Sequence, residues 1–379
     1  MKHKSIISTA DSPLDSCTNK TLIPAGGFEC GFIDETGHWV IKPQFDIAYN
    51  YTYKFAENGL AAVKLNDKWG FIDKTGKWII NPQFDRAWNF AKNGLARVEL
   101  NDKWGYIDET GNLAINLQFD WAYDFAENGL ACVRLNDKRG YINKTGKWVI
   151  NPQFDWGFDW NLVFTENGLA RARLNDKWGY IDITGKWIIN PQFGWADDFT
   201  NGLARVCLNH KSGYIDQTGN LVISPQFDSY ADSFTENGLA RVALGKSGYI
   251  DKTGKWVINP QFDRAYDFAK NGLARVELNY KSGYIDKTGH WVINPQFDDA
   301  WNFAENGWAR VKLNGKWGCI DESGKFVINP QYDYVWIYEN TIFFKQNEWA
   351  LIGKWGIIDK NENIIANPQF DWVGETYDD

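Results

Sequence analysis

The stretch KWGFIDKTGKWIINPQFDRA at residues 68–87 returns almost unchanged as KWGYIDITGKWIINPQFGWA at residues 177–196. Self-similarity at a fixed period indicates a repeat architecture, in which each unit buries its apolar surface against the next copy. Ten copies lie 34 to 39 residues apart, and the last of them is truncated. They begin at Glu29, Lys68, Lys103, Lys138, Lys177, Lys211, Lys246, Lys281, Lys316 and Lys354. We therefore expect a repeat domain over residues 29–379, preceded by an N-terminal arm or cap at residues 1–28.

Each copy contains three segments with the composition of short strands. In the copy that starts at Lys68, these are WGFID at 69–73, WIIN at 78–81 and GLARVEL at 94–100. A polar pair followed by Gly, as in KTG at 74–76, is typical of a tight hairpin, because glycine adopts positive φ without strain. The Pro of the following PQFD offers no N–H to a ladder. The pattern predicts a three-stranded antiparallel sheet in the order third, first, second.

Large apolar residues occupy both faces of the first two predicted strands, as where Trp69 and Phe71 alternate with Ile72. A sheet that is apolar on both faces needs a neighbour on each side, about 10 Å away. We therefore expect an all-β fold, a tandem array of about ten three-stranded antiparallel units stacked as an open β-solenoid or superhelix.

The alternative is a closed β-propeller-like ring. Propellers usually have about 4–8 blades, and a four-stranded blade usually takes about 40–50 residues, so a period of about 35 is short. A ring would also have to join its two ends. The last copy ends without a third strand, and the first lacks one unless TLIPAGG at 21–27 serves.

Two tryptophan positions recur, and the copies treat them differently. The Trp of the second strand, such as Trp78, is replaced only by Leu, Phe or Ile, which predicts a core position. The Trp of the WG pair, such as Trp69, gives way to Cys, Arg or Ser in half of the copies. That tolerance predicts a position near an edge.

Composition limits the classes of function. The 379 residues are 44% hydrophobic and 23% charged, which is enough apolar material for a sizeable core. Forty Lys and Arg stand against 48 Asp and Glu, for a net charge of −8, and the charges are scattered singly. Nucleic-acid binding needs clustered positive charge, so we expect no nucleic-acid partner.

The sequence also bears on the compartment. No segment approaches the roughly 20 apolar residues of a membrane span, and the first residues lack the apolar stretch of an export signal. LDSC at 14–17 matches a lipoprotein cleavage box poorly, because Asp15 and the polar residues before it spoil the pattern. The five cysteines fall at unrelated repeat positions, which indicates neither a disulfide ladder nor a metal framework. We expect a cytoplasmic protein.

Candidates for catalysis are few. The four histidines occupy different positions of the repeat, so they do not predict an acid–base or metal site. Aspartates such as Asp73 and Asp108 end the first strand of their copies. They could bind calcium in a row, but capping of the hairpin through backbone hydrogen bonds is the simpler interpretation. We expect no catalytic residue, no metal and no cofactor.

A row of arginines is the first candidate binding feature. It occupies one position of the third strand, which would line up in stacked copies as a stripe able to bind carboxylates or phosphates. The alternative is an ion-paired ladder, because Asp and Glu lie nearby in the sequence. The row comprises Arg97, Arg171, Arg205, Arg241, Arg275 and Arg310.

Aromatic residues between PQFD and the third strand are the second candidate. Two copies carry insertions of about four residues there, with Tyr49, Tyr51 and Tyr53 in one and Trp156, Phe158 and Trp160 in the other. Exposed rings suit peptide side chains or sugars, whereas buried rings would close the seams between units. Other copies place rings at neighbouring positions, namely Trp88, Trp121, Trp195 and Trp301.

The recurring WG, ID, TG, PQF and GLA motifs of residues 29–379 resemble the bacterial WG-repeat family. The resemblance implies a β-rich repeat domain with no catalytic residues to carry over. We expect a non-enzymatic scaffold that binds a protein or peptide through the variable aromatic and arginine positions. Carbohydrate or cell-envelope binding by an aromatic strip is the alternative, and an enzyme is the least favoured one. The oligomeric state stays open.

Overall fold

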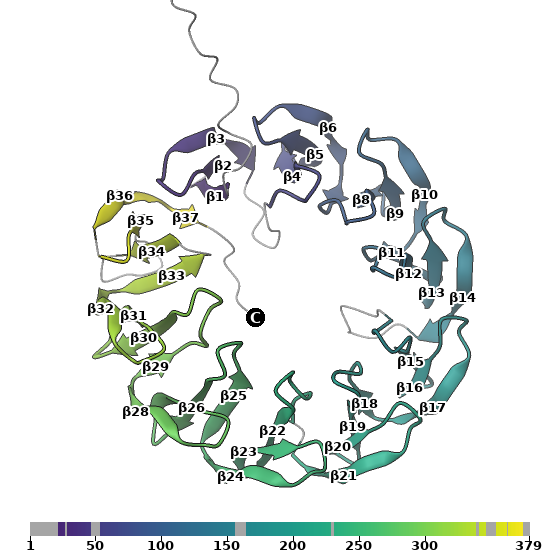
Figure 1. The fold of residues 1–379 in the computed structure, drawn as a ribbon. Coiled ribbons are helices and arrows are strands. Elements are labelled where there is room, and N and C mark those ends of the chain that lie inside the picture. Colours follow the sequence, from purple (N-terminus) through teal and green to yellow (C-terminus); the bar gives the residue numbers. More distant parts are fainter. Residues whose placement is uncertain are drawn as a thin grey trace, which may run out of the picture.

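The computed structural model describes residues 22–26, 29–46, 54–155, 164–228, 231–338, 341–345, 354–361 and 363–373. These residues form strands, turns and loops, and they contain no helix of a length and apolarity that would cross a membrane. The strands assemble into ten small antiparallel sheets. The sheets are arranged around a ring, and one edge strand of each sheet lies along the outside of the ring (Figure 1). We number them as blades 1 to 10 in chain order.

Three strands of each blade correspond to the three predicted from the repeat, in the predicted order. The repeat's third strand lies toward the ring centre (Figure 1). These strands are β1 (Ile23–Gly26), β4 (Leu60–Leu65), β8 (Ala96–Leu100), β12 (Leu130–Leu135), β15 (Ala170–Leu174), β19 (Ala204–Leu208), β22 (Leu239–Leu244), β26 (Ala274–Leu278), β30 (Ala309–Leu313) and β34 (Thr341–Lys345). The middle strands, which begin at the WG motif, are β2 (Glu29–Ile33), β5 (Lys68–Asp73), β9 (Lys103–Ile107), β13 (Lys138–Asn143), β16 (Lys177–Ile181), β20 (Lys211–Ile215), β23 (Lys246–Asp251), β27 (Lys281–Ile285), β31 (Lys316–Ile320) and β35 (Trp355–Ile358).

The outer strands in most blades follow the TG hairpin and contain PQF near their ends. They are β3 (Trp39–Asp46), β6 (Trp78–Phe84), β10 (Leu113–Phe119), β14 (Trp148–Asp155), β17 (Trp187–Phe193), β21 (Leu221–Phe227), β24 (Trp256–Phe262), β28 (Trp291–Phe297), β32 (Phe326–Tyr332) and β36 (Ile364–Phe370). Seven blades add an innermost strand, which in five of them is only two residues long. These strands are β7 (Arg86–Ala87), β11 (Trp121–Ala122), β18 (Trp195–Ala196), β25 (Arg264–Phe268), β29 (Asp299–Ala300), β33 (Tyr334–Tyr338) and β37 (Trp372–Val373).

The expected open solenoid is wrong, because the chain closes into a ring. The last strand, β37, pairs antiparallel with β1, so that Trp372 lies opposite Gly26 and Val373 opposite Ala25. Strand β37 thereby supplies the innermost strand of blade 1, in the sheet order β3-β2-β1-β37. The TLIPAGG segment provides the missing strand of the first copy. A period of about 35 residues is sufficient because the fourth strand of a blade is so short.

Aspartates of the repeat hold turns and neighbouring blades together. At the end of β9, Asp108 accepts hydrogen bonds from the hydroxyl of Thr110 at 2.6 Å and from the amides of Thr110 and Asn112, as hairpin capping predicts. The Asp that follows QF, in PQFD or in the LQFD of residues 117–120, connects blades instead. Asp120 bonds Lys103 of blade 3 at 2.7 Å and the amide of Asn136 of blade 4 at 2.8 Å.

Both tryptophan predictions are wrong. The WG position is buried, with Trp104 fully enclosed and its replacement Arg139 only 1% exposed. The second-strand position is half-buried at the outer rim, where its replacement Leu113 is 48% exposed. There the tryptophan side chain fills the seam between two blades. The indole of Trp148 packs edge-on against the ring of Phe119 in the preceding blade, with 5.8 Å between the ring centres.

Candidate functional site

A hollow of about 570 Å³ opens along the loops that join the innermost strand of a blade to the next strand. Its volume falls within the usual range of roughly 300–1,000 Å³ for ligand sites. The described residues that line it come from blades 8, 9 and 10. They are Tyr266, Arg275, Trp301, Asn302, Ala304, Trp308, Arg310 and Ile337. We call this site the blade 8–10 hollow.

Local structure explains how the side chains converge. Tyr266 lies on the innermost strand β25 and Arg275 on the adjacent β26, so both belong to blade 8. Trp301 directly follows β29, and Trp308 directly precedes β30, so the two rings stand at the two ends of one loop of blade 9. Ile337, on β33, forms the wall that blade 10 contributes.

Arg310 is one of the two charged residues among the described lining of the hollow. The residue is 5% exposed, and its Nη1 donates to the carbonyl of Val335 in blade 10 at 3.2 Å. Its guanidinium carbon lies 4.4 Å from the ring centre of Trp301 and 4.6 Å from that of Trp336. A planar cation between two π faces is attracted by both, and more strongly where water is excluded.

Arg275 repeats this arrangement one blade earlier. It stacks on Tyr266 at 3.5 Å from the ring centre, and its Nη1 donates to the carbonyl of Ala300 in blade 9. Two carboxylates pair with Arg275, since its Nη1 donates to Asp299 at 3.4 Å and its Nη2 lies 4.0 Å from Glu277. The hollow is therefore lined by two guanidiniums and several apolar side chains.

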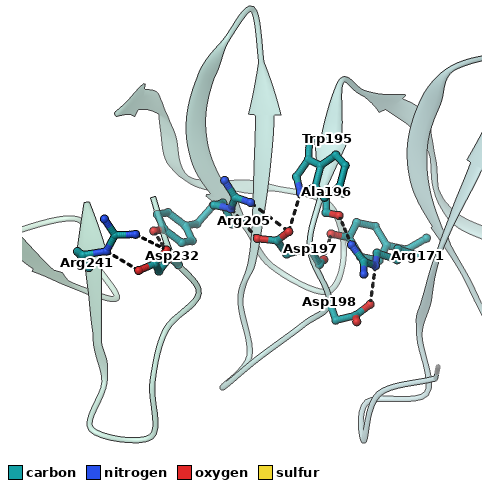
Figure 2. A network of polar contacts seen from close by, with 10 residues as sticks. Arg171, Trp195, Ala196, Asp197, Asp198, Arg205, Asp232 and Arg241 are labelled. Atoms are coloured by element: carbon teal, nitrogen blue, oxygen red, sulfur yellow. Dashed lines mark hydrogen bonds and ion pairs between the residues drawn. The ribbon is translucent and has the colours of Figure 1, made fainter. Parts of the chain in front are cut away.

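The other arginines of the predicted row also form hydrogen bonds within or between blades. Arg97 donates to the carbonyl of Ala122 in the next blade, and Arg171 donates to that of Ala196. Figure 2 shows Arg171 reaching both Ala196 and Asp198 of blade 6.

Arg205 and Arg241 instead form two-pronged ion pairs inside their own blades (Figure 2). Arg205 Nε lies 2.5 Å from Asp197 Oδ2, and Arg241 Nε lies 2.5 Å from Asp232 Oδ2. The arginine row thus serves mainly to join strands and blades, and only Arg275 and Arg310 line the hollow.

The predicted aromatic positions divide in the same way. Trp88 and Trp121 pack around the buried Trp104, with ring centres 5.2 and 4.9 Å away. Trp195 is 38% exposed, and its indole N–H donates to Asp197 at 2.7 Å. Trp301 lines the hollow. The insertion residues Tyr49, Tyr51, Tyr53, Trp156, Phe158 and Trp160 lie outside the described residues.

Trp308 is the lining residue that the sequence analysis missed. It stands in NGWA, where seven other copies have NGLA, and Leu95 is one of these equivalents. This single departure from leucine was the available signal. Because Trp308 is half-buried and packs, like Trp301, against the core cluster shared by blades 9 and 10, it enlarges the apolar wall of the hollow.

A second hollow of about 550 Å³ lies between the corresponding loops of blades 2 and 3. Its lining includes Lys54, Glu57, Lys92 and Glu109, so charges of both signs balance there. It contains Phe55 and Phe90 but no tryptophan or arginine among its described lining residues. It has fewer features that would fix a ligand.

Groups suited to metal binding do not converge in the part of the chain that the structure describes. Three or more potential metal ligands come together nowhere in that part. Burial raises the pKa of the thiols of Cys30, Cys132 and Cys319 to about 12, so these groups stay protonated near neutral pH.

Ten repeated sheets closed into a ring, with a hollow on their loops, define a ten-bladed repeat β-propeller. The chain belongs to the family described as WG containing repeat, whose model matches ten successive segments. These are residues 31–69, 69–104, 104–138, 140–178, 178–211, 213–246, 248–281, 283–317, 317–348 and 355–379.

Two solved structures are similar to the chain at low sequence identity. A structure described as the eukaryotic initiation factor is similar with a TM-score of 0.56 and 10% identity, over 94% of this chain and 98% of that chain. BamB from Moraxella catarrhalis is similar with a TM-score of 0.35 and 10% identity, over 77% of this chain and 92% of that one. These likenesses concern the fold alone. No curated protein sequence matches the chain.

Proposed function

We propose that the protein is a non-enzymatic binding scaffold that holds a segment of a partner protein or a peptide in the blade 8–10 hollow. The observation that carries this proposal is the convergence of Trp301, Trp308, Arg275 and Arg310 at one concave place. Tryptophan and arginine are the residue types that most often dominate binding energy at protein interfaces. A rigid ring supports such a site, because the lining side chains are held by blade packing.

The ring gives the hollow its preorganisation. Arg310 is already stacked between two indoles and bonded to the next blade, so little side-chain freedom is left to lose when a ligand binds. The same rings would suit a sugar, which is the competing class of ligand.

The test is selection of dodecapeptides from a random display library on the immobilised protein, followed by measurement of Kd for the enriched peptides. The test variant is Trp308→Leu, which introduces the residue that seven other copies carry at this position. The matched control is Trp195→Leu, the same change at an exposed ring of blade 6. Circular dichroism checks that both variants are folded.

The proposal expects the peptides to bind wild type and Trp195→Leu equally and Trp308→Leu at least tenfold more weakly. Equal binding to all three proteins would place the site elsewhere and overturn the proposal. Oligosaccharides on an array that bind wild type but not Trp308→Leu, with no peptide enriched, would overturn it in favour of carbohydrate binding.

A further inference from the structure

We propose that the blade 8–10 hollow recognises a proline-rich segment in the extended polyproline II conformation. This inference rests on the proposed function and names the class of peptide that the hollow would hold. It follows from the hydrogen-bonding groups and the aromatic rings that line the hollow.

The two guanidiniums of the hollow hold its rings in place. Arg275 pairs with Asp299 and lies over Tyr266, with 3.5 Å between the guanidinium carbon and the ring centre. Arg310 donates to a backbone carbonyl of blade 10 and lies 4.4 Å from the ring centre of Trp301. Because both arginines are already bonded within the protein, the aromatic rings and the remaining polar groups decide which ligand fits.

Most backbone acceptors of the lining are already used. The carbonyl of Tyr266 accepts from the hydroxyl of Tyr249, and that of Trp301 accepts from the hydroxyl of Tyr284, each at 2.6 Å. Backbone amides of blade 9 donate to the carbonyls of Ala304, Trp308 and Arg310. The described lining residues include no carboxylate. The hollow therefore offers few hydrogen-bond acceptors to a ligand.

Hydrogen-bond donors, in contrast, remain available in the hollow. Trp301 and Trp308 each carry an indole N–H, and neither group donates to a residue that the structure describes. The amide of Asn302 is exposed in the same loop. An indole N–H can only donate. A ligand that brings acceptors and few donors would satisfy these groups.

A proline-rich segment has this combination of groups. Proline lacks a backbone N–H, and the carbonyls of a polyproline II helix form no internal hydrogen bonds. Such segments dock on grooves lined by aromatic rings, and their conformation is formed before binding, so little chain entropy is lost. Tyr266, Trp301 and Trp308 supply three rings from the two adjacent blades 8 and 9.

Other peptides and sugars match the hollow less well. An extended peptide of ordinary residues brings one N–H with every carbonyl, and each sugar hydroxyl both donates and accepts. A donor that is withdrawn from water without an acceptor costs free energy. The shortage of acceptors in the hollow therefore disfavours both of these ligands relative to a proline-rich segment.

The experiment uses two fluorescein-labelled dodecapeptides, one of proline alone and one alternating Leu and Gly. Fluorescence anisotropy gives the Kd of each for the full chain. Trp308→Leu removes both the ring and its donor, whereas Trp308→Phe keeps a ring and removes only the N–H. The matched control is Trp195→Phe, the same change at the exposed tryptophan of blade 6.

We expect dodecaproline to bind wild type and Trp195→Phe equally, and at least tenfold more tightly than the Leu–Gly peptide binds wild type. Trp308→Phe should weaken the binding of dodecaproline about fivefold, which corresponds to one hydrogen bond. Trp308→Leu should weaken it at least tenfold.

Equal binding of the two peptides, with both lost in Trp308→Leu, would overturn the preference for proline while leaving the proposed function in place. Unchanged binding of dodecaproline to Trp308→Phe would overturn the role of the indole N–H, on which the inference depends. Absence of dodecaproline binding would also overturn the inference, and the library selection would then decide the proposed function alone.

Discussion

Arg310 lies over the face of Trp301, with 4.4 Å between the guanidinium carbon and the ring centre. In blades 6 and 7 the place of Trp301 is taken by Asp197 and Asp232, and the arginine forms a two-pronged ion pair instead. One position of the repeat therefore holds its arginine either by a ring or by a carboxylate. In blade 8, where that position holds Tyr266, Arg275 stacks on the ring and also pairs with Asp299 at 3.4 Å.

Because this repeat position holds either an aromatic side chain or an aspartate, an aromatic side chain should be able to replace Asp232 of blade 7. Asp232→Ala should lower the free energy of unfolding by about 1–3 kcal/mol, because it leaves Arg241 partly buried without its carboxylate. Asp232→Tyr should lose clearly less, since the ring would stack on Arg241 as Tyr266 stacks on Arg275. Denaturant titration of both variants measures the difference. Equal losses would mean that the two ways of holding the arginine are not equivalent.

The glycine of the WG motif predicts a local steric limit. A Cβ on Gly105 would lie 2.6 Å from the carbonyl oxygen of Ile115, in backbone that cannot move aside. Gly105→Ala should therefore lower the free energy of unfolding by about 3 kcal/mol. The control is Gly129→Ala, where the space is open and only the φ of +78° disfavours a side chain, at about 1 kcal/mol. A smaller effect at Gly105 than at Gly129 would contradict the described packing of β9 against β10.

Ring closure predicts a stabilising role for the last strand. Removal of residues 372–379 deletes β37 and exposes the edge of β1, which should lower the free energy of unfolding by about 2 kcal/mol through lost ladder hydrogen bonds. Removal of residues 374–379 retains β37 and should change little. Thermal unfolding of the two truncated chains distinguishes the cases, and identical midpoints would argue against closure through β37.

The hairpin aspartates predict loss of stability in acid. The hydroxyl of Thr110 and the turn amides hold the pKa of Asp108 below its usual value, and corresponding bonds lower those of Asp182, Asp216 and Asp251. A lowered pKa in the folded state stabilises the fold above the unfolded value of about 3.9 and is lost as pH falls through the folded value. The thermal midpoint should therefore drop from about pH 4 to pH 2.

Asparagine provides the control for this pH dependence. Asn143 occupies the same place in blade 4 and accepts the same bonds from Thr145 and Lys147 without a titratable group. A variant with Asn at positions 108, 182, 216 and 251 should show a shallower decline between pH 4 and pH 2. An unchanged slope would remove these turns as the origin of the acid sensitivity.

Much of the blade could be predicted from the sequence because its causes are local. Strand alternation, the TG hairpin and the capping role of Asp108 depend on residues close in the chain, and the structure confirms the strand order and the capping. Ring closure could not be predicted in this way. It depends on a small angle accumulated over ten seams and on pairing between Gly26 and Trp372, which lie at opposite ends of the chain.

The errors about tryptophan have a related cause. Tolerance of Ser and Arg at the WG position resembles exposure in a single sequence, yet Ser212 and Arg139 are buried. Each seam is packed by its own pair of blades, so a buried position can differ in size from copy to copy. For the hollow, the row of arginines could be recognised in the sequence. That Arg275 and Arg310 are the two that line the hollow depends on their neighbours Trp308, Asn302 and Ile337, and could not be predicted.

The most direct test of the account is a crystal structure of the protein with a dodecapeptide enriched in the library selection. The account predicts a closed ring of ten blades with the peptide in the blade 8–10 hollow. A side chain of the peptide should lie against Trp308. A peptide bound at another seam, away from Trp308, would contradict it.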